Sequence, residues 1–137
     1  MDQSTILSIL SRTQPQEVKL FAEDLIPDLG PIEVVRNRTG LVMLPAIEPV
    51  KGAAFYLGEA LIAEAYIRLA ETEGYAACLG RDLEQALAIA LIDAARAGSI
   101  ATQKINDFVT RQAALQATAD QQLRVAVEAT RVEMETF

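Results

Sequence analysis

The chain has 137 residues and a formal net charge of −7, with a sequence pI near 4.6. This length fits one domain over residues 1–137, and the acidic balance argues against nucleic acid or an anionic membrane surface as partner, because neutralising phosphates requires clustered Lys and Arg. The sequence has no histidine, which excludes histidine-based metal sites and the Ser–His and Cys–His nucleophile systems.

The composition also indicates where the protein works. Cys78 is the one cysteine, so no intrachain disulfide is possible. The start of the chain lacks the basic segment and apolar run of a signal peptide. No apolar run reaches the ~18–20 residues that span a bilayer. We expect a cytoplasmic protein that binds neither membrane nor nucleic acid and holds no cofactor or metal.

Two helices are predicted at the N-terminus. Ile6 to Leu10 hold an apolar stripe at helical spacing, with Ser4 as a candidate cap. Pro15 suits the first turn of a second helix, because proline there loses no needed N–H. The segment Pro27 to Pro31, which includes Gly30, is expected to end that helix.

The middle of the chain reads as short strands. Ile32 to Arg36 and Leu41 to Leu44 flank Thr39-Gly40, and this order predicts a hairpin. Ala53 to Leu57 follow as a third strand, which Gly58-Glu59 would close.

Residues 60–70 support two interpretations. Their alanines favour a helix, whereas the alternation of apolar residues with Glu64, Tyr66 and Arg68 favours a strand. We prefer the strand, and Tyr75 to Leu79 then form a fifth. The expected fold is α+β, with an antiparallel sheet of about five strands packed against N-terminal helices and two C-terminal helices.

The first C-terminal helix has clear ends. Asp82 is a good N-cap, and Gln85 three residues later completes a capping box. Gly98 is a natural stop. The helix between them is apolar most of the way round, which predicts burial on more than one side. The last helix or a partner would supply the second cover.

The last helix is predicted to be long. Ser99 can cap it, and no Gly or Pro interrupts it up to about Val132. At ~1.5 Å per residue it would span about 45–50 Å, longer than a domain of this size is wide. Part of it should project and meet another chain, so self-association through the C-terminal helices is one expectation.

Gly80-Arg81-Asp82 is the main candidate for binding an anion or a partner. It precedes a helix N-terminus, where free N–H groups attract anions, and Arg81 could add a charged fork. In the competing interpretation the segment is a plain strand-to-helix turn, and the Asp82 carboxylate itself fills the anion position.

Other reactive side chains have structural interpretations beside functional ones. Cys78 lies in an apolar run and is expected to be a buried, inert thiol. Asp93 could be a buried carboxylate with a raised pKa, or it could pair with an Arg or a backbone group. Glu59 and Glu64 would lie on opposite faces of a strand, which argues against a shared acid–base site. We therefore predict no catalytic residues.

Several segments of the chain carry a family resemblance. The most specific pairing is Leu79-Gly80-Arg81-Asp82 followed by Leu91-Ile92-Asp93-Ala94. In order and spacing these segments resemble the PhnG subunit family of the bacterial carbon–phosphorus lyase system. The resemblance covers most of the chain, includes a late helix ending near Arg131 and Val132, and assigns nothing beyond Val132. The other segments are Ser11-Arg12-Thr13-Gln14-Pro15, Thr39-Gly40-Leu41-Val42, Phe55-Tyr56-Leu57-Gly58-Glu59, Gly74-Tyr75-Ala76-Ala77-Cys78 and Ala90.

The resemblance implies a role in phosphonate catabolism. Proteins of this family belong to a core complex with PhnH, PhnI and PhnJ subunits. The implied first step displaces adenine from ATP with a phosphonate and yields a ribose 1-phosphonate 5-triphosphate. PhnI is the implied catalytic partner, and the iron–sulfur radical chemistry belongs to PhnJ. On this basis the chain is an accessory subunit that is not catalytic alone.

Two alternatives stay open at this point. One is a non-enzymatic homo-oligomer with a scaffold or regulatory role. The other is a stand-alone enzyme that acts on a nucleotide or a phosphonate through Arg81, Asp82, Asp93 or Tyr75.

Overall fold

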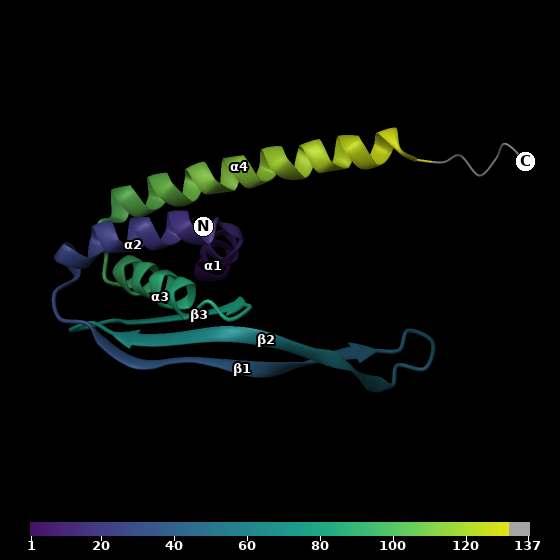
Figure 1. Ribbon diagram of the computed structural model, residues 1–137, viewed down its shortest axis with the longest axis horizontal. Coiled ribbons are helices and arrows are strands. Elements are labelled where there is room, and N and C mark those ends of the chain that lie inside the picture. Colours follow the sequence, from purple (N-terminus) through teal and green to yellow (C-terminus); the bar gives the residue numbers. More distant parts are fainter. Residues whose placement is uncertain (132–137) are drawn as a thin grey trace, which may run out of the picture.

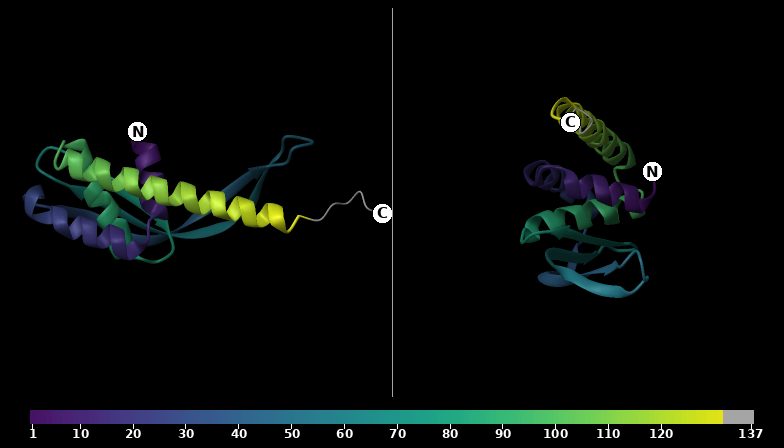
Figure 2. Two further views of the ribbon diagram at one scale, coloured as in Figure 1. Left: turned by 90° about the horizontal axis from the view of Figure 1, so that it is seen from above. Right: turned by 90° about the vertical axis from the view of Figure 1, so that its right-hand side faces the viewer.

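The computed structural model describes residues 1–131, and its helices all lie on one side of an antiparallel sheet (Figure 1). The sheet forms the lowest layer, α3 lies on it, α1 and α2 lie on α3, and α4 forms the outermost layer (Figure 2). The predicted α+β class and the long last helix are confirmed. The elements are α1 Gln3–Arg12, α2 Pro15–Leu29, β1 Glu33–Ile47, β2 Ala54–Arg68, β3 Glu73–Leu79, α3 Leu83–Ala97 and α4 Thr102–Ala129.

The two N-terminal helices form where the sequence places them, with different ends. Asp2 rather than Ser4 caps α1, because its carboxylate accepts the N–H of Thr5 at 2.8 Å. Helix α2 begins at Pro15, as predicted, and continues through Pro27 to Leu29. Pro27 lies in the last turn on an exposed side, so the Glu23 carbonyl that its missing N–H leaves unpaired is open to water.

The described sheet has three strands in the order β1-β2-β3, not about five. Thr39-Gly40 is not a turn: it lies in the middle of β1, with Gly40 opposite Ile62. Gly58 likewise lies inside β2, opposite Leu44. Neither glycine has a positive φ, so both adopt ordinary strand backbone.

The hairpin turn lies instead at residues 48–53. The Glu48 N–H donates to the Ala53 carbonyl at 2.8 Å, and the Glu48 carboxylate accepts the N–H groups of Val50 and Lys51. Gly52 supplies the positive φ of 67°. Glu48 thus forms hydrogen bonds with four other residues of the turn, which fixes the register of two 15-residue strands. Pro45 fits in β1 because it lies at a register shift on an edge strand.

The strand interpretation of the 60–70 segment is confirmed as far as Arg68, the end of β2. Ala63, Ala65 and Ile67 are fully buried beneath α3. Tyr75 to Leu79 lie within β3 and pair with β2.

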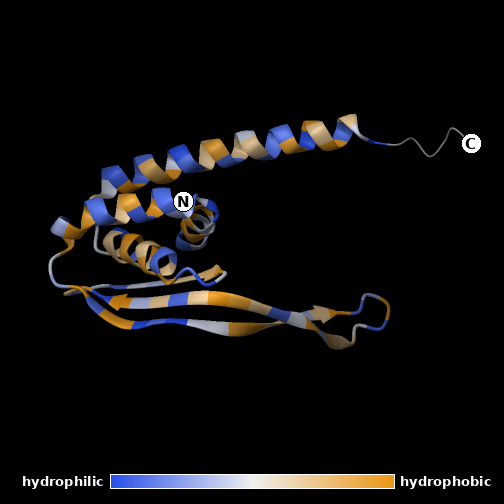
Figure 3. Ribbon diagram, viewed as in Figure 1, coloured by the Kyte–Doolittle hydropathy of each residue, from blue (hydrophilic) through white to orange (hydrophobic). Residues whose placement is uncertain are grey.

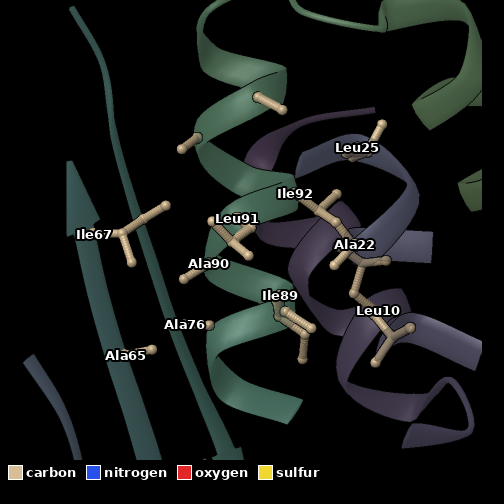
Figure 4. Close-up of a cluster of buried hydrophobic side chains, with 14 of the residues drawn as sticks. Leu10, Ala22, Leu25, Ala65, Ile67, Ala76, Ile89, Ala90, Leu91 and Ile92 are labelled. Carbon is tan, nitrogen blue, oxygen red and sulfur yellow. The ribbon is translucent and has the colours of Figure 1, made fainter. Parts of the chain in front are cut away.

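Helix α3 is the centre of the core. Every residue from Gln85 to Ala95 except Leu87 is buried, which confirms burial on more than one side. The second cover comes from α1 and α2, not mainly from α4 or a partner (Figure 4). Ala90 faces the sheet, while Ile89 and Ile92 face the N-terminal helices. The labelled neighbours are Ala65, Ile67 and Ala76 of the sheet and Leu10, Ala22 and Leu25 of the helices.

Helix α4 begins after a tight connection. Its N-cap is Ala101, without a side-chain hydrogen bond, so Ser99 does not cap it. The described helix ends at Ala129, and the predicted end at Val132 lies outside the described residues. Phe108 stacks on Phe21 of α2 with ring centroids 4.1 Å apart. The second half of α4 extends beyond the rest of the domain, as predicted (Figure 1).

The closest approach of sheet and helix gives the first prediction. A Cβ on Gly74 would overlap the carbonyl oxygen of Ala90 and would lie 2.8 Å from the Ala94 Cβ. Gly74→Ala should therefore lower the free energy of unfolding by about 3 kcal/mol, because α3 must move off β3. Gly58→Ala is the control, since a Cβ there meets nothing within 4 Å. Urea denaturation of both variants tests this, and equal midpoints would contradict it.

Candidate functional site

A polar cluster covers the face of the sheet that carries no helix. Strand pairing sets Arg38 of β1 opposite Glu64 of β2, and Tyr75 of β3 reaches the same carboxylate. Glu64 accepts a hydrogen bond from the Tyr75 hydroxyl at 2.6 Å. It also pairs with the Nε atoms of Arg38 at 3.2 Å and Arg36 at 3.3 Å.

Aromatic and charged groups extend this cluster along β2. The guanidinium groups of Arg36 and Arg68 lie 5.4 and 5.9 Å from the Tyr66 ring centroid. Arg68 also pairs with Glu73 at 3.4 Å and approaches Glu33. Three arginines thus face three carboxylates, and the cluster has no net charge. It offers no surplus cation for a phosphate group.

The protonation states in this cluster do not suit acid–base catalysis. The hydrogen bond from Tyr75 and the nearby Arg38 and Arg36 lower the pKa of Glu64, outweighing the opposing effect of burial. The same hydrogen bond raises the pKa of Tyr75. At neutral pH Glu64 is therefore ionised and Tyr75 protonated, so neither is tuned to exchange a proton with a substrate.

The Gly80-Arg81-Asp82 segment forms the turn between β3 and α3. The Asp82 carboxylate accepts the Gln85 N–H at 3.0 Å and pairs with Lys19 of α2 at 2.8 Å. These two contacts, the Lys19 bond first, lower the pKa of Asp82. Arg81 is exposed beside it. The Asp82 side chain thus occupies the N-terminus of α3, and an anion-binding or interface role of Arg81 and Asp82 stays a prediction.

Asp93 is 2% exposed and holds β3 to the helices. Its carboxylate accepts the backbone N–H of Tyr75 at 3.1 Å and the side-chain amide of Gln3 at 3.2 Å, and it pairs with Arg96 at 3.4 Å. This bears out the expected pairing with an Arg and a backbone group. Because β3 is an edge strand, the hydrogen bond to Asp93 also pairs a Tyr75 N–H that could otherwise bond to a strand of another chain.

Cys78 is 5% exposed, and its thiol contacts the Gln85 side-chain oxygen at 3.5 Å. Burial, and then the negative charge of Asp82, raise the pKa of the thiol. Cys78 is therefore a protonated core residue rather than a thiolate nucleophile.

The predicted separation of Glu59 and Glu64 holds, because they are five positions apart on one strand and successive side chains point to opposite faces. The sequence showed Glu64, Tyr66 and Arg68 on one face, yet it missed the part played by Arg36 and Arg38. Only the strand register brings these arginines to Glu64. Within residues 1–131 no three carboxylate or thiol side chains are grouped to hold a metal ion.

Two projections form a second kind of surface. The hairpin arm (residues 40–61) and the helix arm (residues 115–129) extend beyond the helical layers on the same side of the molecule (Figure 1). Apolar residues recur along both (Figure 3). The exposed ones are Leu41, Val42, Met43, Leu44, Ile47, Val50, Phe55, Tyr56 and Leu57 in the hairpin arm and Leu115, Leu123, Val125 and Val127 in the helix arm.

This much apolar surface is unusual for an isolated domain and indicates interaction with a protein or a membrane. No described helix combines the length and apolar character needed to cross a bilayer. A two-stranded ribbon alone is marginally stable in water. The arms therefore have the exposed apolar character of an interaction surface.

The edge contact of Asp93 gives a second prediction. Asp93→Ala should lower the free energy of unfolding by about 3 kcal/mol, because it leaves the Tyr75 N–H and Arg96 without a buried partner. Asp120→Ala removes a carboxylate that pairs with Arg12 at 2.9 Å but is half exposed, and it should cost less than about 1 kcal/mol. Thermal unfolding of the two variants checks the ranking, and a reversed order would refute it.

The Glu64–Tyr75 hydrogen bond gives a third prediction, on pH dependence. Because the folded-state pKa of Glu64 lies below its ordinary value of 4.5, its contribution to stability is present above about pH 4.5 and is lost as the pH falls through the folded pKa. The stability difference between the natural chain and Tyr75→Phe should therefore be larger at pH 7 than at pH 3. In a Glu64→Gln background this pH dependence should vanish, and its persistence there would assign it to other groups.

Comparison with known families agrees with the resemblance. A family model described as "Phosphonate metabolism protein PhnG" matches residues 2–137. The match spans the polar cluster, both arms and the α3 core. The chain therefore belongs to the PhnG family of phosphonate metabolism proteins.

Proposed function

We propose that this chain is an accessory subunit of a cytoplasmic carbon–phosphorus lyase core complex. In this role it binds PhnH-, PhnI- and PhnJ-like subunits. It supports transfer of the ribose triphosphate of ATP onto an alkylphosphonate, with release of adenine. Membership of the PhnG family supports the pathway, and the exposed apolar arms are the observation that carries the subunit role.

The described side chains support a division of labour. Displacing adenine requires a site that binds a polyphosphate and assists a departing base. In residues 1–131 the arginines of the open face are matched by carboxylates, and the N-terminus of α3 holds Asp82. We therefore assign the chemistry to the partner subunits and binding to this chain.

Co-expression with PhnH-, PhnI- and PhnJ-like subunits from the same organism tests the subunit role. We expect the chain to co-purify with them in constant proportion, and we expect ATP- and methylphosphonate-dependent adenine release to fall at least tenfold when it is omitted. Recovery of a stable, fully active complex without the chain would refute the proposal.

The purified chain alone separates the alternatives. We expect no adenine release from ATP and methylphosphonate, whereas release that Arg81→Ala abolishes would favour a stand-alone enzyme. A stable homo-oligomer that does not exchange with the other subunits would favour a separate scaffold.

A further inference from the structure

The helix arm continues a face that is buried in the rest of α4. Ile105 and Val109 of α4 are buried. Two turns further on, Gln116 donates to the Ile9 carbonyl at 2.9 Å, and Asp120 then pairs with Arg12. These contacts place the same side of α4 against α1 as far as Asp120.

The next positions on that side are apolar and uncovered. Leu123 lies 18 residues after Ile105, which is five full turns at 3.6 residues per turn, and Val127 follows one turn later. Their side chains therefore point in the direction in which Ile105 and Val109 meet the domain. Leu123 is nevertheless 65% exposed and Val127 60% exposed.

The hairpin arm likewise continues a face of the sheet that is buried nearer the core. Ala63 and Ala65 face α3 and are fully buried. The next residue on that face is Leu61, paired with Leu41, and Met43 follows two residues later on β1. Leu41 and Met43 are each 65% exposed, because α3 does not reach them.

The helical layers of the domain set how far apart the two arms begin. Inside the domain, two helical layers separate α4 from the sheet: α3 on the strands, and α1 with α2 above it. Helix axes pack 8–10 Å apart, so this filling is about 20 Å thick. Beyond the domain the arms continue in the same general direction, splaying apart when seen from above (Figure 2).

We propose that the space between the arms holds two packed helices of a partner subunit, one against Leu123 and Val127 and the other against Leu41 and Met43. These helices would continue the two layers of the domain. The helix arm would pack on a helix, as the first half of α4 packs on α1, and the hairpin arm would pack on a helix, as the rest of the sheet packs on α3. The inference rests on the proposed subunit role and names the surface that performs it.

A second copy of the chain fits this space poorly. Within residues 1–131, α1, α2 and α3 pack in the core, with Leu20 and Ile26 of α2 exposed, whereas the helix arm exposes four large apolar residues. It could fill one layer but not two. The net charge of −7 also makes two copies repel, whereas a partner with basic residues flanking its apolar helices would be attracted.

Matched substitutions test the proposal on the full chain. Leu123→Asp and Met43→Asp place a charge on the inward sides of the arms. Gln121→Asp and Gly40→Asp place the same charge on the outward sides, at exposed positions that are not part of the apolar surface of the arms. Each inward variant should weaken binding to the assembled PhnH-, PhnI- and PhnJ-like subunits at least tenfold, and each outward variant less than threefold. Circular dichroism melting controls for folding.

Cross-linking identifies the occupant. Met43→Cys and Leu123→Cys chains, each carrying a photoreactive maleimide, should capture the same partner subunit at two adjacent helices. Equal losses from inward and outward variants, capture of different subunits, or capture of a second copy would overturn the inference. Failure of the natural chain to bind those subunits at all would instead overturn the proposed function.

Discussion

The close contact between α3 and the sheet is the constraint on which the rest of the structure depends. Small residues form it from both sides: Gly74 and Ala76 on β3, and Ala90 and Ala94 on α3. Because these side chains add so little thickness, the backbone of α3 lies close to that of β3. Larger residues of α3, such as Ile92, then point away from the sheet and pack against α1 and α2. The alanine-rich composition thus produces a closely layered stack.

The sequence predicted the elements whose signals are local. The Asp82 cap, the burial of α3 on several sides and the strand interpretation of residues 60–70 each depend on a few neighbouring residues, and each is confirmed. The predicted number of strands was wrong because Thr39-Gly40 and Gly58-Glu59 lie inside strands rather than at strand ends. The chain reverses instead at residues 48–53. In that turn the Glu48 carboxylate accepts two backbone N–H groups, and Gly52 adopts the positive φ that the turn requires. A comparison between distant segments, rather than a count of glycines, would have been needed.

The open-face cluster could not be predicted, for a related reason. Arg38 and Glu64 are 26 residues apart, and only the strand register makes them neighbours. One residue of slip would move Arg36 and Arg38 to the helical side of the sheet. Of the two exposed arms, the sequence predicted the helix arm, from the length of α4. It did not predict the hairpin arm, which exists because four expected short strands are in fact the two long strands β1 and β2.

The connection between α3 and α4 has a consequence for assembly. Ser99 and Ala101 both adopt left-handed backbone, with φ of 55° and 51°, a conformation that costs roughly 1 kcal/mol for residues with a Cβ. The chain holds it because Ile105, Phe108 and Val109 anchor the first turns of α4 on the domain. The direction of the helix arm is therefore set by folding, before any other chain arrives. Association then loses little orientational freedom in that arm, and its rigidity favours affinity in the way that preorganised binding surfaces do.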